Sequence, residues 1–120
     1  MNTILVVDDE ATVANLLREL LDSSGYKVAI AISGEDALTM LDQQEESFDL
    51  IITDQNMPGM SGEDMAKRVF ELYPSLPVTI NSGYTDGIDN SLLAETNVKE
   101  IMQKPVQMRE LLKKVQLYIQ

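Results

Sequence analysis

Short apolar runs alternate with longer amphipathic stretches along the whole chain. A short apolar run bounded by turn formers is typical of a strand that is buried on both faces. The first such run, Ile4-Leu5-Val6-Val7, leads directly into three carboxylates, Asp8-Asp9-Glu10. Five strands are predicted in all, at Thr3–Val7, Tyr26–Ile32, Phe48–Thr53, Val78–Asn81 and Val98–Gln103.

The stretches that follow the strands place apolar residues three and four positions apart, which predicts helices. Ser33 and Ser61 directly precede two of these stretches and are expected to be N-caps. The predicted helices are Thr12–Leu21, one that starts after Ser33, Glu63–Tyr73, Asp86–Thr96 and Met108–Ile119. Their predicted apolar faces comprise Val13, Leu16, Leu17, Leu20 and Leu21; Ala37, Leu38 and Leu41; Met65, Ala66, Val69, Phe70 and Leu72; Ile88, Leu92 and Leu93; and Met108, Leu111, Leu112, Val115 and Ile119.

The alternation of strands and helices defines the expected fold class. Five strands, each followed by a helix, indicate an α/β fold with a doubly wound, five-stranded parallel sheet and helices on both faces. No internal repeat, low-complexity tract or linker interrupts the 120 residues. Because this length suits one compact core, residues 1–120 are expected to form a single domain.

The composition narrows the chemistry that the chain can support. Its net charge of −11 argues against direct binding to nucleic acid or to a membrane, because both carry negative charge. There is no cysteine and no histidine, so any bound metal should be a hard, oxygen-liganded ion such as Mg²⁺. No basic leader and no apolar segment near the roughly 20 residues of a membrane span is present, so a cytoplasmic location is expected.

Chemically capable residues follow four of the predicted strands. Asp8 and Asp9 follow the first strand, Asp54 the third, Ser82 the fourth and Lys104 the fifth. Ligands of an open parallel sheet bind beyond the carboxyl ends of its strands, where these residues should meet. Two carboxylates about 5 Å apart repel by roughly 3 kcal/mol at an effective dielectric near 20, and Mg²⁺ would reverse this repulsion. A metal, a carboxylate nucleophile, a lysine and a hydroxyl are the parts needed for phosphoryl transfer to an aspartate.

Four segments together resemble the response-regulator receiver domain over essentially the full length of the chain. Each segment alone is a weak signal, but their order, spacing and placement at strand ends are specific. The resemblance implies the flavodoxin-like strand order 2-1-3-4-5. The segments are VVDDE at Val6–Glu10, DLIITDQNMPGMSG at Asp49–Gly62, SGYTD at Ser82–Asp86 and QKP at Gln103–Pro105.

The resemblance implies a role for each acidic residue at the strand ends. Asp54 would be the phospho-acceptor and also a ligand of Mg²⁺. Asp9 would bind the ion directly, and Asp8 would act through a bound water. The backbone carbonyl of Asn56 would complete the ligands that the protein supplies.

Two further residues receive roles from the same resemblance. Ser82 would bond a phosphoryl oxygen after transfer, and Lys104 would pair with Asp54 or with its phosphate. The Lys104-Pro105 peptide bond is expected to be cis. Two positions depart from the common receiver pattern, because Ile101 and Val106 stand where many receivers carry aromatic residues. These departures leave the chemistry intact and place the aromatic-switch route to an output in doubt.

The implied function is that of a phosphorylatable switch in a two-component system. The phosphoryl donor would be a phosphohistidine on a histidine kinase or on a histidine phosphotransfer domain. The chain would not be an enzyme, since it would catalyse only its own phosphorylation and slow autodephosphorylation. A phosphorylation-dependent homodimer is a further expectation, and the chain could stand alone or belong to a hybrid sensor kinase. The face expected to meet the histidine-bearing helix contains Thr12, Val13, Asn15 and Leu16.

Three other functions compete with this interpretation. A small Mg²⁺-dependent phosphatase with an aspartyl-phosphate intermediate would share the nucleophile. Such an enzyme carries a second acid two residues after the first, and this chain has Asn56 at that position. A flavodoxin-like nucleotide binder would need a loop rich in Ser, Thr or Gly after the first strand, where this chain is acidic. A receiver that has lost its chemistry, and acts only as an interaction module, conflicts with the complete set of site residues.

Each site residue also has an ordinary structural interpretation. Asp8 and Asp9 suit the solvated start of a helix, where acids are favoured. Asp54 could be a turn or capping residue, and Ser82 a plain hydroxyl at a strand end. Lys104 could be an exposed surface lysine. These interpretations lose weight because all five residues are expected at one edge of the sheet.

Overall fold

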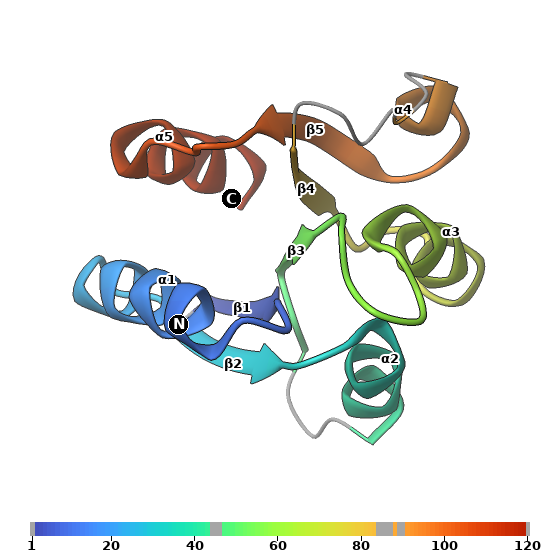
Figure 1. Ribbon diagram of the computed structural model, residues 1–120, viewed down its shortest axis with the longest axis horizontal. Helices are drawn as coiled ribbons and strands as arrows, with labels where there is room; N and C mark the ends of the chain where they lie inside the picture. Colours follow the sequence, from blue (N-terminus) through green and yellow to red (C-terminus); the bar gives the residue numbers. More distant parts are fainter. Residues whose placement is uncertain (1, 44–46, 84–87, 89–90, 120) are drawn as a thin grey trace.

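The computed structural model describes residues 2–43, 47–83, 88 and 91–119. Strands and helices alternate through this part of the chain (Figure 1). The strands are β1 (Thr3–Val7), β2 (Lys27–Ala31), β3 (Leu50–Asp54), β4 (Val78–Ser82) and β5 (Val98–Gln103). The helices are α1 (Ala11–Ser23), α2 (Gly34–Gln43), α3 (Gly62–Leu72), α4 (Ser91–Glu95) and α5 (Met108–Tyr118).

The five strands form one parallel sheet in the order β2-β1-β3-β4-β5. This order and the doubly wound α/β class confirm the fold expected from the sequence. Helices α1 and α5 cover one face of the sheet, and α2, α3 and α4 cover the other (Figure 1). Because the order reverses between β1 and β3, the carboxyl ends of these two strands mark the switch point where a ligand site is expected.

Alternate side chains of each central strand enter two separate cores. In β1, Ile4 and Val6 pack with α1 and α5, whereas Leu5 and Val7 pack with α2 and α3. All residues of β1, β3 and β4 are buried, which accounts for the unbroken apolar runs in the sequence. Edge strand β2 is more exposed: Lys27 is exposed, and Val28, Ala29 and Ile30 are only partly buried.

The predicted boundaries agree with the structure most closely for the strands. β1 and β5 begin and end where the sequence predicts, and β3 and β4 extend to include Asp54 and Ser82. Both expected N-caps form, because the hydroxyl oxygens of Ser33 and Ser61 accept backbone N–H groups three residues ahead. Helix α4 covers Ser91–Glu95 of the predicted stretch Asp86–Thr96, and residues 86–87 and 89–90 of that stretch lie outside the described residues.

The helices bury narrower stripes than their apolar spacing predicts. In α1 the buried residues are Ala14, Leu17 and Leu21, one stripe spaced three and four apart, and Val13 and Leu16 lie beside it in solvent. A helix on a flat sheet buries only its contacting side, so apolar residues on its flanks stay exposed. The predicted apolar faces are wrong for the same reason at Phe70, Leu72, Leu93 and Met108. Within the described residues no helix combines the length and apolar character needed to cross a membrane.

Candidate functional site

Three carboxylates gather beyond the ends of β1 and β3. The two strands pair in parallel, with Val7 opposite Thr53, so the next residues, Asp8 and Asp54, lie side by side. One carboxylate oxygen from each of Asp8, Asp9 and Asp54 can be chosen so that all three lie within 4.8 Å of one another. This arrangement follows from the strand order, because residues 46 positions apart in the sequence reach the same edge of the sheet.

The side chains of this acidic cluster differ in their exposure to solvent. Asp8 and Asp54 are only 6% and 4% exposed, whereas Asp9 is exposed. Burial raises the pKa of Asp8 above its ordinary value, and the charges of Asp54 and Asp9 raise it further. The backbone N–H of Glu10, 2.9 Å from Asp8 Oδ1, and the charge of Lys104 oppose this rise in pKa. The folded protein therefore holds Asp8 in a setting that disfavours its negative charge.

Lys104 brings a positive charge to the cluster from β5. Its Nζ pairs with Oδ1 of Asp54, so the ammonium offsets part of the repulsion among the acids. The backbone N–H of Lys104 donates to the carbonyl of Ser82 at 2.8 Å, which ties the end of β5 to the end of β4. The peptide bond between Lys104 and Pro105 is cis, as the sequence resemblance implied.

Ser82 is the last residue of β4 and is buried at the same edge of the sheet. Its neighbour Asn81 pairs with Asp54 in the β3–β4 ladder. Ser82 therefore lies one residue further along β4 than the residue opposite Asp54. The hydroxyl donates to the carbonyl of Gly83 at 3.1 Å. Residues Asp8, Asp9, Asp54, Ser82 and Lys104 thus come from four strand ends to one edge, as the sequence predicts.

Glu10 does not belong to the acidic cluster, although it follows Asp9 directly. It is the exposed N-cap residue of α1, where its side chain makes no capping hydrogen bond. Its backbone serves the site instead, because its N–H holds the carboxylate of Asp8. Glu10 therefore contributes its backbone N–H to the site, and its carboxylate is not part of the acidic cluster.

The connection between β3 and α3 contains two residues that sequence reasoning missed. The side chain of Gln55 is buried, and its Oε1 accepts the backbone N–H of Glu63 at 2.7 Å. A Cβ atom on Gly62 would lie 2.5 Å from the carbonyl oxygen of Asp54, so only glycine fits there. Both interactions depend on the first turn of α3 lying against the end of β3, a three-dimensional approach that no local pattern signals.

The donor set of the cluster suits a hard divalent cation. Carboxylate oxygens are preferred by Mg²⁺, which binds one or two carboxylates and keeps several waters. Three such oxygens lie close together here, and one of the three residues is open to solvent. Burial of like charges without a cation is unfavourable, which gives a physical reason for the site to take one.

An apolar groove opens beside the cluster, between α1 and the start of α5. It has a volume of about 570 Å³, and Asp8, Asn81 and Lys104 lie along it. The exposed side chains of Leu16 and Met108, 52% and 44% exposed, belong to its walls. Exposed apolar residues gathered next to charged groups are typical of a surface that receives another molecule. The other apolar lining residues are Val13, Leu17, Pro105 and Val106.

Comparison with known proteins identifies the family. The profile of the response regulator receiver domain matches residues 4–116. The chain is 36% identical over 115 residues to the transcriptional regulatory protein CpxR of Klebsiella pneumoniae, covering 96% of this chain and 48% of CpxR. It is 34% identical over 112 residues to the DNA-binding response regulator MtrA of Mycobacterium leprae, covering 93% of this chain and 48% of MtrA. The chain belongs to the response-regulator receiver family, and it spans about half the length of these curated relatives.

Solved structures of receiver domains superimpose on nearly the whole chain. A receiver domain from Clostridium thermocellum is 32% identical with a TM-score of 0.90, covering 99% of this chain and 94% of the other. The response regulator TrrA of Thermotoga maritima, solved with Mg²⁺ and beryllium fluoride, is 30% identical with a TM-score of 0.87, covering 99% and 100%. The chain is therefore the receiver part of a two-component signalling protein, a class of switches rather than ordinary enzymes.

Proposed function

We propose that Asp54 accepts a phosphoryl group from a phosphohistidine in a Mg²⁺-dependent reaction and so switches the conformation of the domain. The observation that carries this proposal is the placement of the buried Asp54 carboxylate, beside two other carboxylates and paired with Lys104. A carboxylate oxygen of Asp54 attacks phosphorus, and a P–O bond forms as the P–N bond to the imidazole breaks. The electron pair of the broken bond returns to the imidazole nitrogen, and neutral imidazole leaves because its other ring nitrogen carries the proton, so Asp54 takes no part in proton transfer.

The neighbouring residues neutralise charge and orient the phosphoryl group. Asp9, Asp54 and the backbone carbonyl of Asn56 would hold Mg²⁺, with Asp8 acting through a water. Bound Mg²⁺ would supply charge neutralisation for the oxygens of the transferred group. Lys104 would leave the carboxylate of Asp54 for a phosphoryl oxygen, and the hydroxyl of Ser82 would bond another. Supporting this assignment, TrrA was solved with Mg²⁺ and a beryllium fluoride group.

The proposed partner is a histidine kinase or a histidine phosphotransfer domain that presents its histidine on a helix. The groove between α1 and α5 lies directly beside Asp8 and Lys104, so a helix on the exposed side chains of Val13 and Leu16 would reach the acidic cluster. A phosphorylation-dependent homodimer and a cytoplasmic location, which is typical of the family, are further parts of the proposal. Direct binding of nucleic acid is not proposed for this acidic chain, although the relative MtrA is named as a DNA-binding response regulator.

A phosphorylation assay tests the assignment of Asp54. Incubation with acetyl phosphate and Mg²⁺ should add one phosphoryl group to the intact protein, measured as a mass shift. Asp54→Asn should abolish the shift, because the amide is not a nucleophile of comparable strength. Asp49→Asn, at the opposite end of β3, is the matched control and should leave the shift unchanged. Full-rate labelling of the Asp54→Asn variant would show that another residue is the acceptor.

A further inference from the structure

Gln55 follows Asp54 directly and is held by three hydrogen bonds. Its backbone N–H donates to the carbonyl of Asn81 at 3.0 Å, and its carbonyl accepts the N–H of Gly62 at 3.0 Å. Its side chain is only 9% exposed, and its Oε1 accepts the N–H of Glu63 at 2.7 Å. The residue is therefore tied to β4 on one side and to the first turn of α3 on the other.

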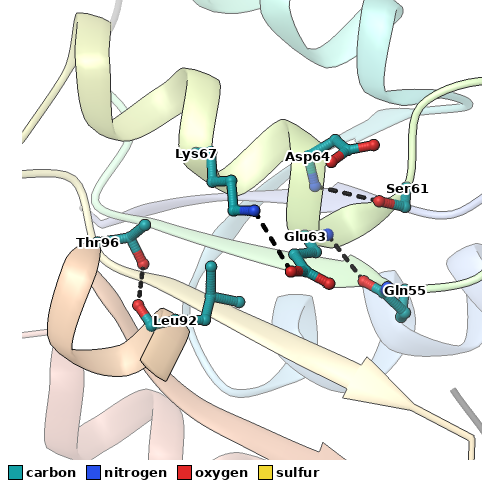
Figure 2. Close-up of polar contacts among 7 residues, drawn as sticks. All are labelled: Gln55, Ser61, Glu63, Asp64, Lys67, Leu92 and Thr96. Atoms are coloured by element: carbon teal, nitrogen blue, oxygen red, sulfur yellow. Dashed lines mark hydrogen bonds and ion pairs between the residues drawn. The ribbon is translucent and has the colours of Figure 1, made fainter. Parts of the chain in front are cut away.

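The side-chain hydrogen bond closes the loop between β3 and α3 (Figure 2). The loop leaves β3 after Asp54 and returns to it at Gly62. The two residues lie so close that a Cβ atom on Gly62 would be 2.5 Å from the carbonyl oxygen of Asp54. The backbone N–H of Glu63 is one of the first N–H groups of α3, which have no partner within the helix. The amide of Gln55 thus joins the residue after the phospho-acceptor to the start of α3.

Asn56, whose backbone carbonyl is the proposed metal ligand, lies immediately after this fixed residue. A carbonyl has no side-chain torsion of its own, so its direction depends on how the flanking peptide units are held. Groups that orient the ligands of a metal contribute strongly to its affinity, even without touching it. The three hydrogen bonds of Gln55 hold the peptide unit that precedes Asn56, on the side of the loop nearest the acidic cluster.

We propose that Gln55 is a positioning residue for Mg²⁺ binding, whose side-chain amide holds the β3–α3 loop so that the carbonyl of Asn56 faces the acidic cluster. This inference rests on the proposed function, since it assigns Gln55 to the metal site of that reaction. It also connects the site with α3, because the same amide holds the N–H of Glu63.

A second side chain at the start of α3 separates positioning from simple helix capping. The hydroxyl of Ser61 accepts the N–H of Asp64 at 3.1 Å, so α3 has two side-chain acceptors at its first turn (Figure 2). Loss of either should weaken the helix to a similar extent. Gln55 follows Asp54 directly at the end of β3, whereas Ser61 lies at the far end of the loop, so only the loss of the Gln55 amide should disturb the metal site.

The test measures Mg²⁺ affinity by NMR titration of the backbone amides of Gln55→Met and Ser61→Ala. Gln55→Met keeps the length of the side chain and removes the acceptor, and it should weaken Mg²⁺ binding about tenfold. Ser61→Ala should lower the melting temperature to a similar extent and leave the Mg²⁺ dissociation constant unchanged. With acetyl phosphate, Gln55→Met should need about tenfold more Mg²⁺ for half-maximal labelling and recover its rate at saturating Mg²⁺.

Each other result has a distinct meaning. Wild-type affinity in Gln55→Met, or equal weakening in Ser61→Ala, would overturn the positioning role and leave the proposed function standing. No Mg²⁺ binding by the wild-type protein would instead remove the proposed metal site itself and this inference with it. Gln55→Asn is a second variant that keeps a polar side chain, but its amide is too short to reach Glu63. If Gln55→Met does not fold, Gln55→Asn replaces it in the titration, and the same weakening of Mg²⁺ binding is expected.

Discussion

At the scale of single residues, the negative charge of Asp8 is held in an unfavourable environment. It is buried beside Asp54 and Asp9, and its Oδ1 accepts the backbone N–H of Glu10. Burial and neighbouring charge raise the pKa of Asp8 above the ordinary value of 3.8. A group of this kind lowers the stability of the fold while it is ionised, which a cation in the site would relieve.

Asp8→Asn should therefore stabilise the metal-free protein at neutral pH, by about 1 kcal/mol or a few degrees in melting temperature. The amide oxygen can still accept the N–H of Glu10, so the change removes charge and keeps the hydrogen bond. Asp49→Asn removes the same charge at the amino end of β3, far from the acidic cluster. There Asp49 Oδ2 accepts the N–H of Thr3. If both variants gain equally, the effect reflects net charge and the clustered-acid explanation fails.

The pH dependence of this difference follows from the raised pKa of Asp8. The folded protein binds the Asp8 proton more tightly than the unfolded chain, so this group's contribution to stability falls as pH rises from 3.8 through the raised pKa. The advantage of Asp8→Asn should be absent well below pH 3.8 and should grow as the pH rises through the raised pKa of Asp8. Thermal unfolding across this range, without Mg²⁺, measures it.

At the scale of secondary-structure elements, the strands deliver the site and the helices hold the strand ends in place. The ends of β1 and β3 could be predicted to within one residue because their apolar runs give way to Asp8 and Asp54, and parallel pairing brings such ends together. The role of Gln55 could not be predicted in this way. Its hydrogen bond to Glu63 depends on how closely α3 approaches β3, which is decided by glycine at position 62.

The helix faces were harder to predict for a related reason. Leu16 and Met108 have the spacing of core residues, yet both lie in the wall of an open groove. Apolar spacing shows that a face is apolar, and only the packed structure shows whether another element of the same chain covers it. On α1 and α5 the sheet covers one stripe, and the apolar residues beside it stay exposed.

Two threonines on neighbouring strands offer a test of how hydrogen bonds stabilise the sheet. Thr53 Oγ1 donates to the carbonyl of Asp54 at 3.0 Å, whereas the buried Oγ1 of Thr79 has no hydrogen-bond partner among the described residues. Thr79→Val should raise the free energy of unfolding by about 1 kcal/mol, because an unsatisfied buried hydroxyl is replaced by a methyl group. Thr53→Val should lower it by about 1 kcal/mol. Urea unfolding measures both, and changes of the same sign would contradict this explanation.

At the scale of the whole molecule, the question is how an event at Asp54 reaches the far side of the sheet. If Asp54 is phosphorylated as proposed, Lys104 would be the direct link, because its ammonium pairs with Asp54 and its backbone continues β5. Ile101 lies on that strand, half-buried against the core shared with α2, α3 and α4. An aliphatic residue there cannot act as an aromatic switch, so we expect a signal to pass through movement of β5 and the segments packed on it.

Lys104→Ala should separate the chemistry from this signal. Some phosphorylation by acetyl phosphate should remain, since the nucleophile and the acidic cluster are intact, but the amide shifts of β5 and α5 should no longer change on labelling. The NMR spectra are compared at equal phosphorylated fraction, which mass spectrometry determines. Lys114→Ala is the matched control, because it removes a lysine paired with Glu100 of β5 at 2.9 Å without touching the site. Changes in β5 that persist in Lys104→Ala would mean that the signal leaves Asp54 by another route, with the β3–α3 loop held by Gln55 as the next connection to test.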